Sequence, residues 1–261
     1  MSMLYIRKLT HRYGVTDVLS DITLRLGAGE TVALVGPSGC GKSTLLHCVA
    51  GLLTPSSGAI ESTFARLGMV FQQPRLMPWK RAVDNISLGL KAAGIPAATR
   101  RQQAMELAEC LGLGPDDMGK YPHELSGGMQ SRVSLGRALA IKPDLMVLDE
   151  PFSALDVGLK VELYALMRDQ VTRNATAVLM ITHDVMEAAR LADRIVMMKP
   201  DPGRVVREFV LDQAHAHRDD AWVYAMAGRL MQDDEVRAGF GLMAEGQSVS
   251  IGLGADHKES A

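Results

Sequence analysis

The chain has 261 residues, of which 47% are hydrophobic and 22% are charged, with a formal net charge of −2 and a pI near 6.4. This is ordinary globular composition without a strongly basic character, so we expect no nucleic-acid partner. The three cysteines match neither a zinc site nor a disulfide framework, which favours a reducing compartment. The sequence contains no apolar run that could cross a bilayer and no signal-peptide pattern at its start. If the protein works at a membrane, we expect another chain to carry the span.

Residues 3 to 35 have the alternating pattern of short strands, with turns at Tyr13-Gly14 and Gly27-Ala28-Gly29. Tyr13 is the first aromatic residue after the opening strand and lies at a turn. An aromatic ring in this place could stack on an adenine base, or it could only pack against the turn. The spacing favours neither interpretation.

The segment Gly36–Thr44 matches the pattern G-x-x-x-x-G-K-[ST] of a phosphate-binding loop, between a predicted buried strand at Thr31–Val35 and a predicted helix. In such a loop, backbone N–H groups and the helix N-terminus point at a phosphate group. Lys42 supplies positive charge for the β- and γ-phosphates, and the Ser43 hydroxyl can bind Mg²⁺. We therefore predict that this chain binds a nucleoside triphosphate.

A short hairpin is predicted between residues 58 and 68, leading into a buried strand that ends just before Gln72. A glutamine at the end of a core strand can reach Mg²⁺ or an attacking water, although a solvated loop glutamine is the commoner case. Trp79 follows in a loop, where it is explained equally well as an exposed anchor for a partner or as a side chain buried under the loop. The helical pattern from Val83 to Leu113 breaks near Gly94-Ile95-Pro96, and we interpret it as part of a helical subdomain inserted into an α/β core.

The stretch Leu125–Gln130 opens another predicted helix, which runs through Leu139, with Ser126 at its start. Ser126 is a good N-cap, and Gly127 and Gly128 expose backbone N–H groups at the positive end of the helix dipole. This pattern predicts a second anion site, for a phosphate that another copy of the chain could hold. The alternative is a plain helix cap.

The apolar strand Leu145–Asp149 ends in two consecutive carboxylates, Asp149 and Glu150. In a parallel sheet, ligands lie at the carboxyl ends of the strands, where both acids would lie. Asp149 can hold Mg²⁺ through water, and Glu150 can take a proton from the attacking water. A further predicted core strand ends at His183, which could hydrogen-bond a γ-phosphate at the same sheet edge.

A helix at Val185–Leu191 and a strand at Arg194–Met198 are predicted to complete the core. The segment that follows them is more polar than the core. His215 and His217 are two residues apart, which does not suit a helical metal pair, and we expect both to be solvated. Residues 221 to 232 predict one short helix, and we expect the chain to be frayed from about residue 246.

Together, these motifs resemble the ATP-binding subunits of ABC transporters. The resemblance covers about residues 3 to 212, with the motifs in the family's order. They are the phosphate loop Gly36–Thr44, the Q-loop at Gln72, the signature Leu125–Gln130, the Walker B strand ending at Asp149 with the catalytic base Glu150, the D-loop Ser153–Asp156 and the switch histidine His183.

The resemblance implies an α/β fold of the P-loop NTPase type. A mainly parallel sheet flanked by helices would carry an N-terminal antiparallel β-subdomain and a helical subdomain inserted at about residues 75–140. The ATP-binding domain would cover residues 1–212, and residues 213–261 would form a C-terminal extension with a short helix and a flexible end.

It also implies that two copies, or this chain and a like subunit, pair head to tail around two ATP molecules with Mg²⁺. Each ATP would lie between the phosphate loop of one chain and the signature of the other, with Tyr13 stacked on adenine. The implied catalytic residues are Glu150, His183 and Gln72; the implied nucleotide-binding residues are Tyr13, Gly36, Pro37, Ser38, Gly39, Cys40, Gly41, Lys42, Ser43, Thr44, Ser126, Gly127, Gly128 and Asp156; and the implied Mg²⁺ ligands are Ser43, Gln72 and Asp149.

A finer resemblance is to bacterial importers of the nitrate/sulfonate/taurine and thiamine-precursor type. It depends on Arg75–Lys80, on Asp84-Asn85-Ile86 and on the turn Pro200–Arg204. It implies an integral-membrane permease as partner, a periplasmic solute-binding protein as indirect partner, and a peripheral place on the cytoplasmic face of the inner membrane. An exporter subunit and a soluble ABC-type ATPase of cofactor assembly are the alternatives.

Overall fold

The first strands of the chain form an antiparallel sheet of their own. In the computed structural model, which describes residues 2–239, β1 (Met3–Tyr13) lies between β2 (Thr16–Gly27) and β4 (Ser57–Ser62). The predicted hairpin between residues 58 and 68 is wrong. β4 pairs with the free edge of β1, and the strand that follows it joins the other sheet.

The second sheet has six strands, the first five of which in spatial order are parallel while the last is antiparallel. Their order is β5 (Leu67–Val70), β6 (Leu145–Asp149), β7 (Ala177–Ile181), β3 (Thr31–Val35), β8 (Arg194–Lys199) and β9 (Arg204–Val210). The strand β9 was not predicted, because it is an edge strand whose charged and exposed residues hide its pattern.

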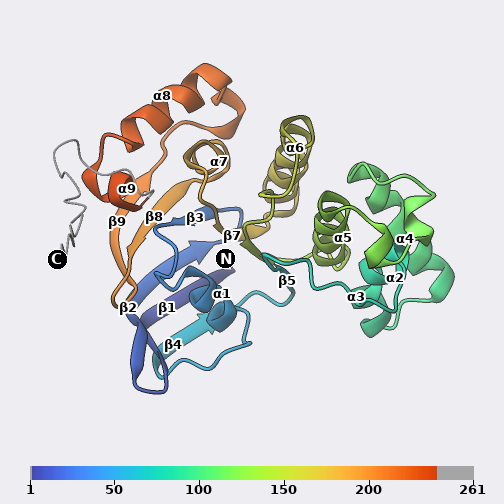
Figure 1. Cartoon of the computed structure of the whole chain (residues 1–261), viewed down its shortest axis with the longest axis horizontal. Coiled ribbons are helices and arrows are strands. Elements are labelled where there is room, and N and C mark those ends of the chain that lie inside the picture. Colours follow the sequence, from blue (N-terminus) through green and yellow to red (C-terminus); the bar gives the residue numbers. More distant parts are fainter. Residues whose placement is uncertain (1, 240–261) are drawn as a thin grey trace, which may run out of the picture.

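Alternate residues of the central strands enter two different cores, as the two-residue period of a strand requires. Val147 of β6, for example, packs with β1, β2 and α1 (Lys42–Val49), whereas Leu148 packs with helices on the other face. Those helices include α6 (Val157–Asn174), α7 (Val185–Leu191) and α8 (Asp220–Leu230) (Figure 1). The sheet is therefore covered on both faces, which confirms the predicted P-loop α/β fold.

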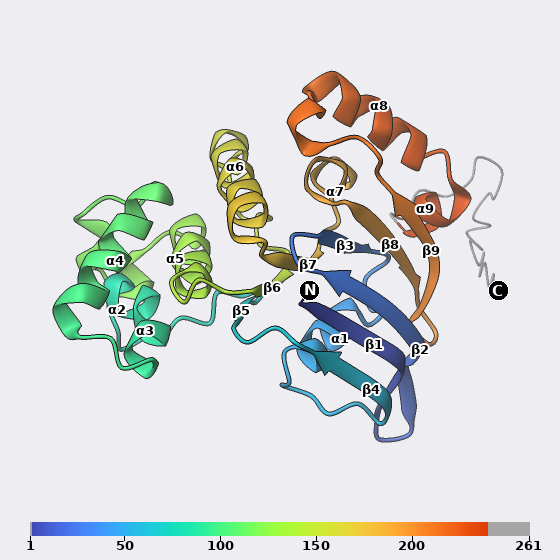
Figure 2. The same ribbon diagram turned by 180° about the vertical axis from the view of Figure 1, so that it is seen from behind.

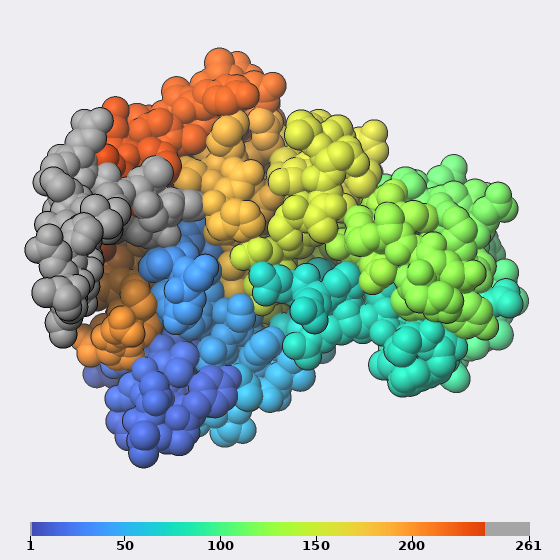
Figure 3. All heavy atoms as spheres, viewed as in Figure 1, coloured from blue at the N-terminus to red at the C-terminus, as the bar shows by residue number. Residues whose placement is uncertain are grey.

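A helical part projects from one end of the molecule (Figures 2 and 3). The break at Gly94, where φ is +78°, separates its shorter helices from the longer helix that follows. It consists of α2 (Ala82–Ile86), α3 (Leu88–Ala92), α4 (Ala97–Cys110), the 3-10 turns η1 (Asp117–Gly119) and η2 (Pro122–Glu124), and α5 (Gly127–Leu139).

The segment after β9 packs against α7 and against Asp193, the residue that precedes β8. The Arg218 side chain is buried and donates hydrogen bonds to four backbone carbonyls, including those of Ala189 and Ala192 at the end of α7. His217 is exposed, but the expectation that His215 is solvated is wrong. The short turn η3 (His215–His217) places its Nε2 atom 3.0 Å from the Asp193 carboxylate.

The C-terminal helix predicted at residues 221 to 232 corresponds to α8, and a further helix, α9 (Asp234–Gly239), follows it. The frayed end predicted from about residue 246 lies outside the described residues. Between residues 2 and 239, none of the helices combines the length and the apolar composition of a membrane span.

Candidate functional site

The phosphate loop and the carboxyl ends of β6 and β7 surround one cavity, which has an empty volume of about 670 Å³ and opens to solvent. Its lining residues come from segments far apart in the sequence. They are Val18, Ser38, Gly39, Gly41, Lys42, Ser43, Thr44, Gln72, Asp149, Glu150 and Ile181. The structure therefore brings most of the predicted loop together with Gln72 and both predicted acids.

The loop backbone depends on its glycines. Gly36, Gly39 and Gly41 have φ values of +152°, +81° and +90°, which L side chains rarely adopt. A Cβ atom on Gly36 would also lie 2.3 Å from the carbonyl oxygen of Met198. The Lys42 Nζ atom donates hydrogen bonds to the carbonyls of Gly36 (2.7 Å) and Pro37 (2.9 Å), so the lysine folds back over the loop that precedes it.

The three residues that the sequence predicts as catalytic lie together, because Gln72 and His183 both contact Glu150. Its Oε2 atom accepts a hydrogen bond from Gln72 Nε2 at 3.4 Å and lies 3.4 Å from His183 Nδ1. The backbone of Glu150 is in the left-handed region, with φ of +47°. This conformation is uncommon outside glycine, and such strain is found most often at functional sites. The side chains of Gln72 and His183 thus converge on one carboxylate oxygen beside the phosphate loop.

Asp149, one residue earlier, is only 5% exposed. Burial raises the pKa of its carboxyl, the nearby Glu150 charge raises it further, and a hydrogen bond with Ser43 opposes both. The hydroxyl of Ser43, the amide oxygen of Gln72 and the carboxylate of Asp149 are hard oxygen ligands, which Mg²⁺ prefers. Among residues 2–239, no group of three or more His, Cys, Asp or Glu side chains could hold a metal. This donor set fits a cation that also binds phosphate oxygens, as Mg²⁺ does at nucleotides.

Several predicted nucleotide-binding residues lie outside this cavity. Tyr13 is 51% exposed at the β1–β2 turn and packs edge-on against His11. Ser126 caps α5 through a 3.2 Å hydrogen bond from the Met129 N–H to its hydroxyl, and Asp156 caps α6 in the same way. The cap predicted at Ser126 is confirmed, whereas the roles of these residues toward a nucleotide stay predictions.

Two residues next to the loop, Val18 and Gly203, were not predicted from the sequence as site residues. Val18 lines the cavity, and Gly203 exchanges backbone hydrogen bonds with β2, donating to Val18 and accepting from Ser20, both at 2.9 Å. A Cβ atom on Gly203 would lie 2.3 Å from the carbonyl oxygen of Cys40 in the phosphate loop. The turn containing Gly203 was visible in the sequence, but its contact with a loop far away in the chain was not.

We expect Gly203→Ala to destabilise the protein by about 1–3 kcal/mol, the usual cost of overpacking, and to weaken ATP binding. The added methyl group must push the Cys40 backbone away, which changes the phosphate loop. Thermal unfolding and titration with a fluorescent ATP analogue measure the two effects. Gly228→Ala is the matched control, because a Cβ atom there meets nothing within 4 Å. Equal behaviour of the two variants would show that the loop does not depend on this contact.

Comparison with known proteins gives consistent matches. Residues 19–153 match the family model described as ABC transporter. The taurine import ATP-binding protein TauB of Rhizobium johnstonii is 42% identical over 209 residues, covering 77% of this chain and 79% of that protein. The aliphatic sulfonates import ATP-binding protein SsuB 2 of Burkholderia cenocepacia is 41% identical over 229 residues, covering 84% and 82%.

Solved structures agree with these relatives. The dimeric post-hydrolysis state of the ATP-binding cassette MJ0796 bound to ADP and Pi has a TM-score of 0.75 and 29% sequence identity to this chain. The match covers 81% of this chain and 100% of that cassette.

Proposed function

The chain belongs to the ABC transporter family, and we propose that it is the ATP-hydrolysing subunit of a bacterial importer for taurine or another small sulfonate. As a member of this family, the protein binds ATP and hydrolyses it to drive transport. Proteins of this family dimerise and work with a membrane permease. The observation that carries the proposed chemistry is the convergence of Gln72 and His183 on the Glu150 carboxylate beside the phosphate loop. The solute class is supported by the names of the two relatives.

In the proposed mechanism, the backbone N–H groups of the phosphate loop and the Lys42 ammonium bind the β- and γ-phosphates of ATP. Glu150 accepts a proton from the attacking water, and His183, whose Nδ1 atom lies 3.4 Å from the Glu150 carboxylate, contacts the γ-phosphate. Ser43, Gln72 and Asp149 would hold Mg²⁺. Bound Mg²⁺ would neutralise charge on the phosphate oxygens.

A second copy of the chain, or a like subunit, would complete each site. We place Ser126, Gly127, Gly128 and Asp156 of one copy against the ATP held by the other, with Tyr13 stacked on the adenine ring. The support is that these residues lie outside the cavity of their own chain, and that the related cassette is a dimer. ATP then joins the two copies and hydrolysis separates them, which gives two states that a transporter can use.

In this proposal residues 1–212 form the ATP-binding domain, which contains the helical subdomain at about 75–140, and residues 213–261 form an extension. The protein would lie on the cytoplasmic face of the inner membrane, next to its permease. A periplasmic solute-binding protein would deliver the solute without contacting this chain.

The loop after Gln72 is our candidate for the permease contact. Arg137 donates hydrogen bonds to the carbonyls of Pro74 (2.8 Å) and Arg75 (2.9 Å), and Asn85 accepts from the Met77 N–H at 2.8 Å. Asn85 also donates a hydrogen bond to the Lys80 carbonyl at 3.0 Å, so the loop is held on both sides of Trp79, which is 70% exposed. Trp79 is therefore not buried under the loop, and its role as an anchor for a partner stays a proposal. A large apolar side chain on a fixed loop has the character of an interface anchor.

We expect Trp79→Ala to reduce permease-stimulated ATPase activity and transport by about 30-fold, as loss of an interface anchor of about 2 kcal/mol implies. ATPase activity without the permease should be unchanged, because Trp79 does not line the ATP cavity. Reconstituted vesicles containing both subunits measure the stimulated rate. Tyr224→Ala, at a similarly exposed aromatic residue on α8, is the control. Wild-type stimulation in the Trp79 variant would exclude this residue as an anchor.

The experiment that tests the proposed function is purification of the tagged protein from detergent-solubilised membranes of the native host, with mass spectrometry of the accompanying chains. A multi-span permease, and ATP-dependent uptake of taurine or an alkanesulfonate by the reconstituted complex, are the expected results. Recovery only with soluble assembly partners would refute the importer assignment.

A further inference from the structure

Two buried polar side chains connect α6 with α7. Tyr164 lies on α6 and Glu187 on α7, and both are buried. The Tyr164 hydroxyl donates a hydrogen bond of 3.0 Å to the Glu187 carboxylate inside the protein. Apolar side chains of similar size would often stabilise a fold as well as such a buried polar pair. The hydrogen bond has a direction, however, and can fix the relative position of the two helices.

The chemistry of the two groups makes Tyr164 the donor. Burial raises the pKa of the Tyr164 hydroxyl, and the nearby Glu187 charge raises it further, so the hydroxyl keeps its proton. Burial also raises the pKa of Glu187, while hydrogen bonds with Thr182 and Tyr164 oppose this change. The Glu187 carboxyl group thus has one hydrogen-bond partner on α6 and another directly after β7.

The Glu187 end of the pair is bonded to both neighbours of His183. Thr182 precedes His183 and hydrogen-bonds Glu187, and its Oγ1 atom also accepts the backbone N–H of Asp184 at 3.0 Å. Asp184 follows His183, and its carboxylate accepts the backbone N–H of Glu187 at 3.2 Å. The backbone on both sides of His183 is therefore tied to residue 187, and a shift of Glu187 should move the imidazole.

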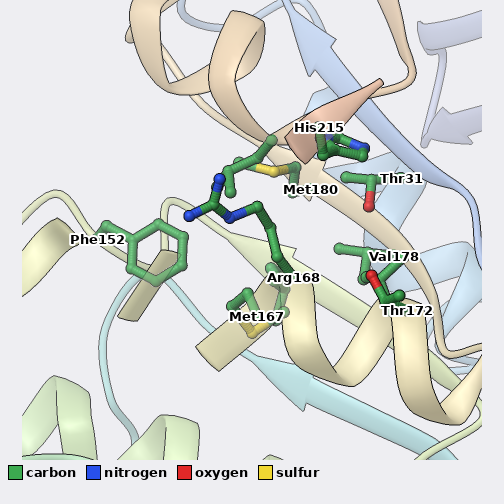
Figure 4. Close-up of a pocket in the computed structure, with 11 residues that line it drawn as sticks. Thr31, Phe152, Met167, Arg168, Thr172, Val178, Met180 and His215 are labelled. Carbon is green, nitrogen blue, oxygen red and sulfur yellow. The ribbon is translucent and has the colours of Figure 1, made fainter. Parts of the chain in front are cut away.

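The Tyr164 end of the pair contacts Phe152, which follows Glu150 by two residues. The two aromatic rings meet edge-on, with centroids 5.1 Å apart and planes at 88°. Phe152 is fully buried and lines a small cavity under α6 together with Met167 (Figure 4). The left-handed backbone of Glu150 persists only because the surrounding structure holds it. The packing of Phe152 against Tyr164 is part of that surrounding structure.

Given the catalytic roles proposed above for Glu150 and His183, we propose that Tyr164 is a positioning residue for ATP hydrolysis. Glu150 follows β6 and His183 follows β7, and their side chains are 3.4 Å apart. Tyr164 holds this distance through its hydrogen bond on the α7 side and its ring contact on the β6 side. A displaced catalytic group lowers the rate of the chemical step much more than it lowers substrate binding.

Tyr164→Phe removes only the hydroxyl group and tests this role. We expect the ATPase turnover number to fall about tenfold, while the dissociation constant for ATP stays within about twofold of the wild type. ATP binding should be kept because Tyr164 does not line the ATP cavity. Steady-state kinetics and titration with a fluorescent ATP analogue measure the two quantities. Tyr224→Phe, at an exposed tyrosine on α8, makes the same chemical change and should keep wild-type turnover.

A double variant separates positioning from stability. Tyr164→Phe alone leaves the buried Glu187 with one partner fewer, which should lower the unfolding temperature. In Tyr164→Phe/Glu187→Met both groups are apolar and close to their original size, so the unfolding temperature should recover. Turnover should stay about tenfold below the wild type in the double variant, because the hydrogen bond is still absent.

Recovery of turnover together with stability in the double variant would overturn the proposal, because Tyr164 would then act through stability alone. Wild-type turnover in Tyr164→Phe would also overturn it, as would an equal loss of turnover and ATP affinity. Glu150→Gln is measured beside these variants. If it is inactive while Tyr164→Phe is normal, only the role of Tyr164 is refuted. Normal turnover in both would refute the proposed catalytic residues as well.

Discussion

Glutamine in place of Glu150 is expected to lower the ATPase turnover number by about 10²–10⁴-fold, the usual contribution of a general base. An amide has nearly the same shape as the carboxylate but cannot accept the proton of the attacking water. Its oxygen can still accept the hydrogen bond from Gln72, so the geometry around residue 150 should be kept. ATP affinity should stay close to that of the wild type, because Lys42 and the phosphate loop are unchanged.

The same variant should accumulate as an ATP-bound dimer. If hydrolysis separates the two copies, a chain that binds ATP but does not cleave it stays paired. Steady-state ATPase assays, ATP titration, and light scattering with and without ATP measure turnover, affinity and mass. Glu106→Gln on the exposed surface of α4 is the matched control for the chemical change. Normal turnover in Glu150→Gln would move the catalytic base to another residue.

The core of this site is predictable from the sequence because its motifs are local. Gly36–Thr44 needs only its own strand, glycines and helix to form a phosphate loop, and these elements follow one another directly along the chain. Glu150 and His183 each follow a continuous apolar run, so a parallel sheet places them at one edge. Their separation of 3.4 Å and the contact of Gln72 with the same oxygen follow from that arrangement.

The features that could not be predicted from the sequence depend on contacts between distant segments. Gly203 has the ordinary pattern of a turn residue, and its importance comes from the Cys40 carbonyl that the fold brings against it. His215 lies in a polar segment typical of solvated residues, but Asp193 and the fold of η3 partly bury it. β9 has charged and apolar residues in neighbouring pairs, without the two-residue alternation of a half-buried strand, so its pairing with β8 at the edge of the sheet is what makes it a strand.

Lys42→Ala should lose ATP binding itself, whereas Glu150→Gln should keep ATP binding and lose hydrolysis. We expect ATP affinity to fall by about 100-fold or more, since hydrogen bonds between charged groups contribute about 1.5–3 kcal/mol each and tenfold corresponds to about 1.4 kcal/mol. ATPase activity and the ATP-dependent dimer should be lost together. The fold should survive, because the carbonyls of Gly36 and Pro37 that Lys42 now contacts border an open cavity and can bind water instead.

ATP titration, light scattering and thermal unfolding test this expectation, with Lys91→Ala on the exposed side of α3 as the control. The double variant Lys42→Ala/Glu150→Gln links the two predictions. If ATP joins the two copies, the double variant must stay monomeric with ATP although it cannot hydrolyse it. A dimer in the double variant would mean that pairing does not require ATP in the phosphate loop, and the proposed cycle of closure and release would then be wrong for this protein.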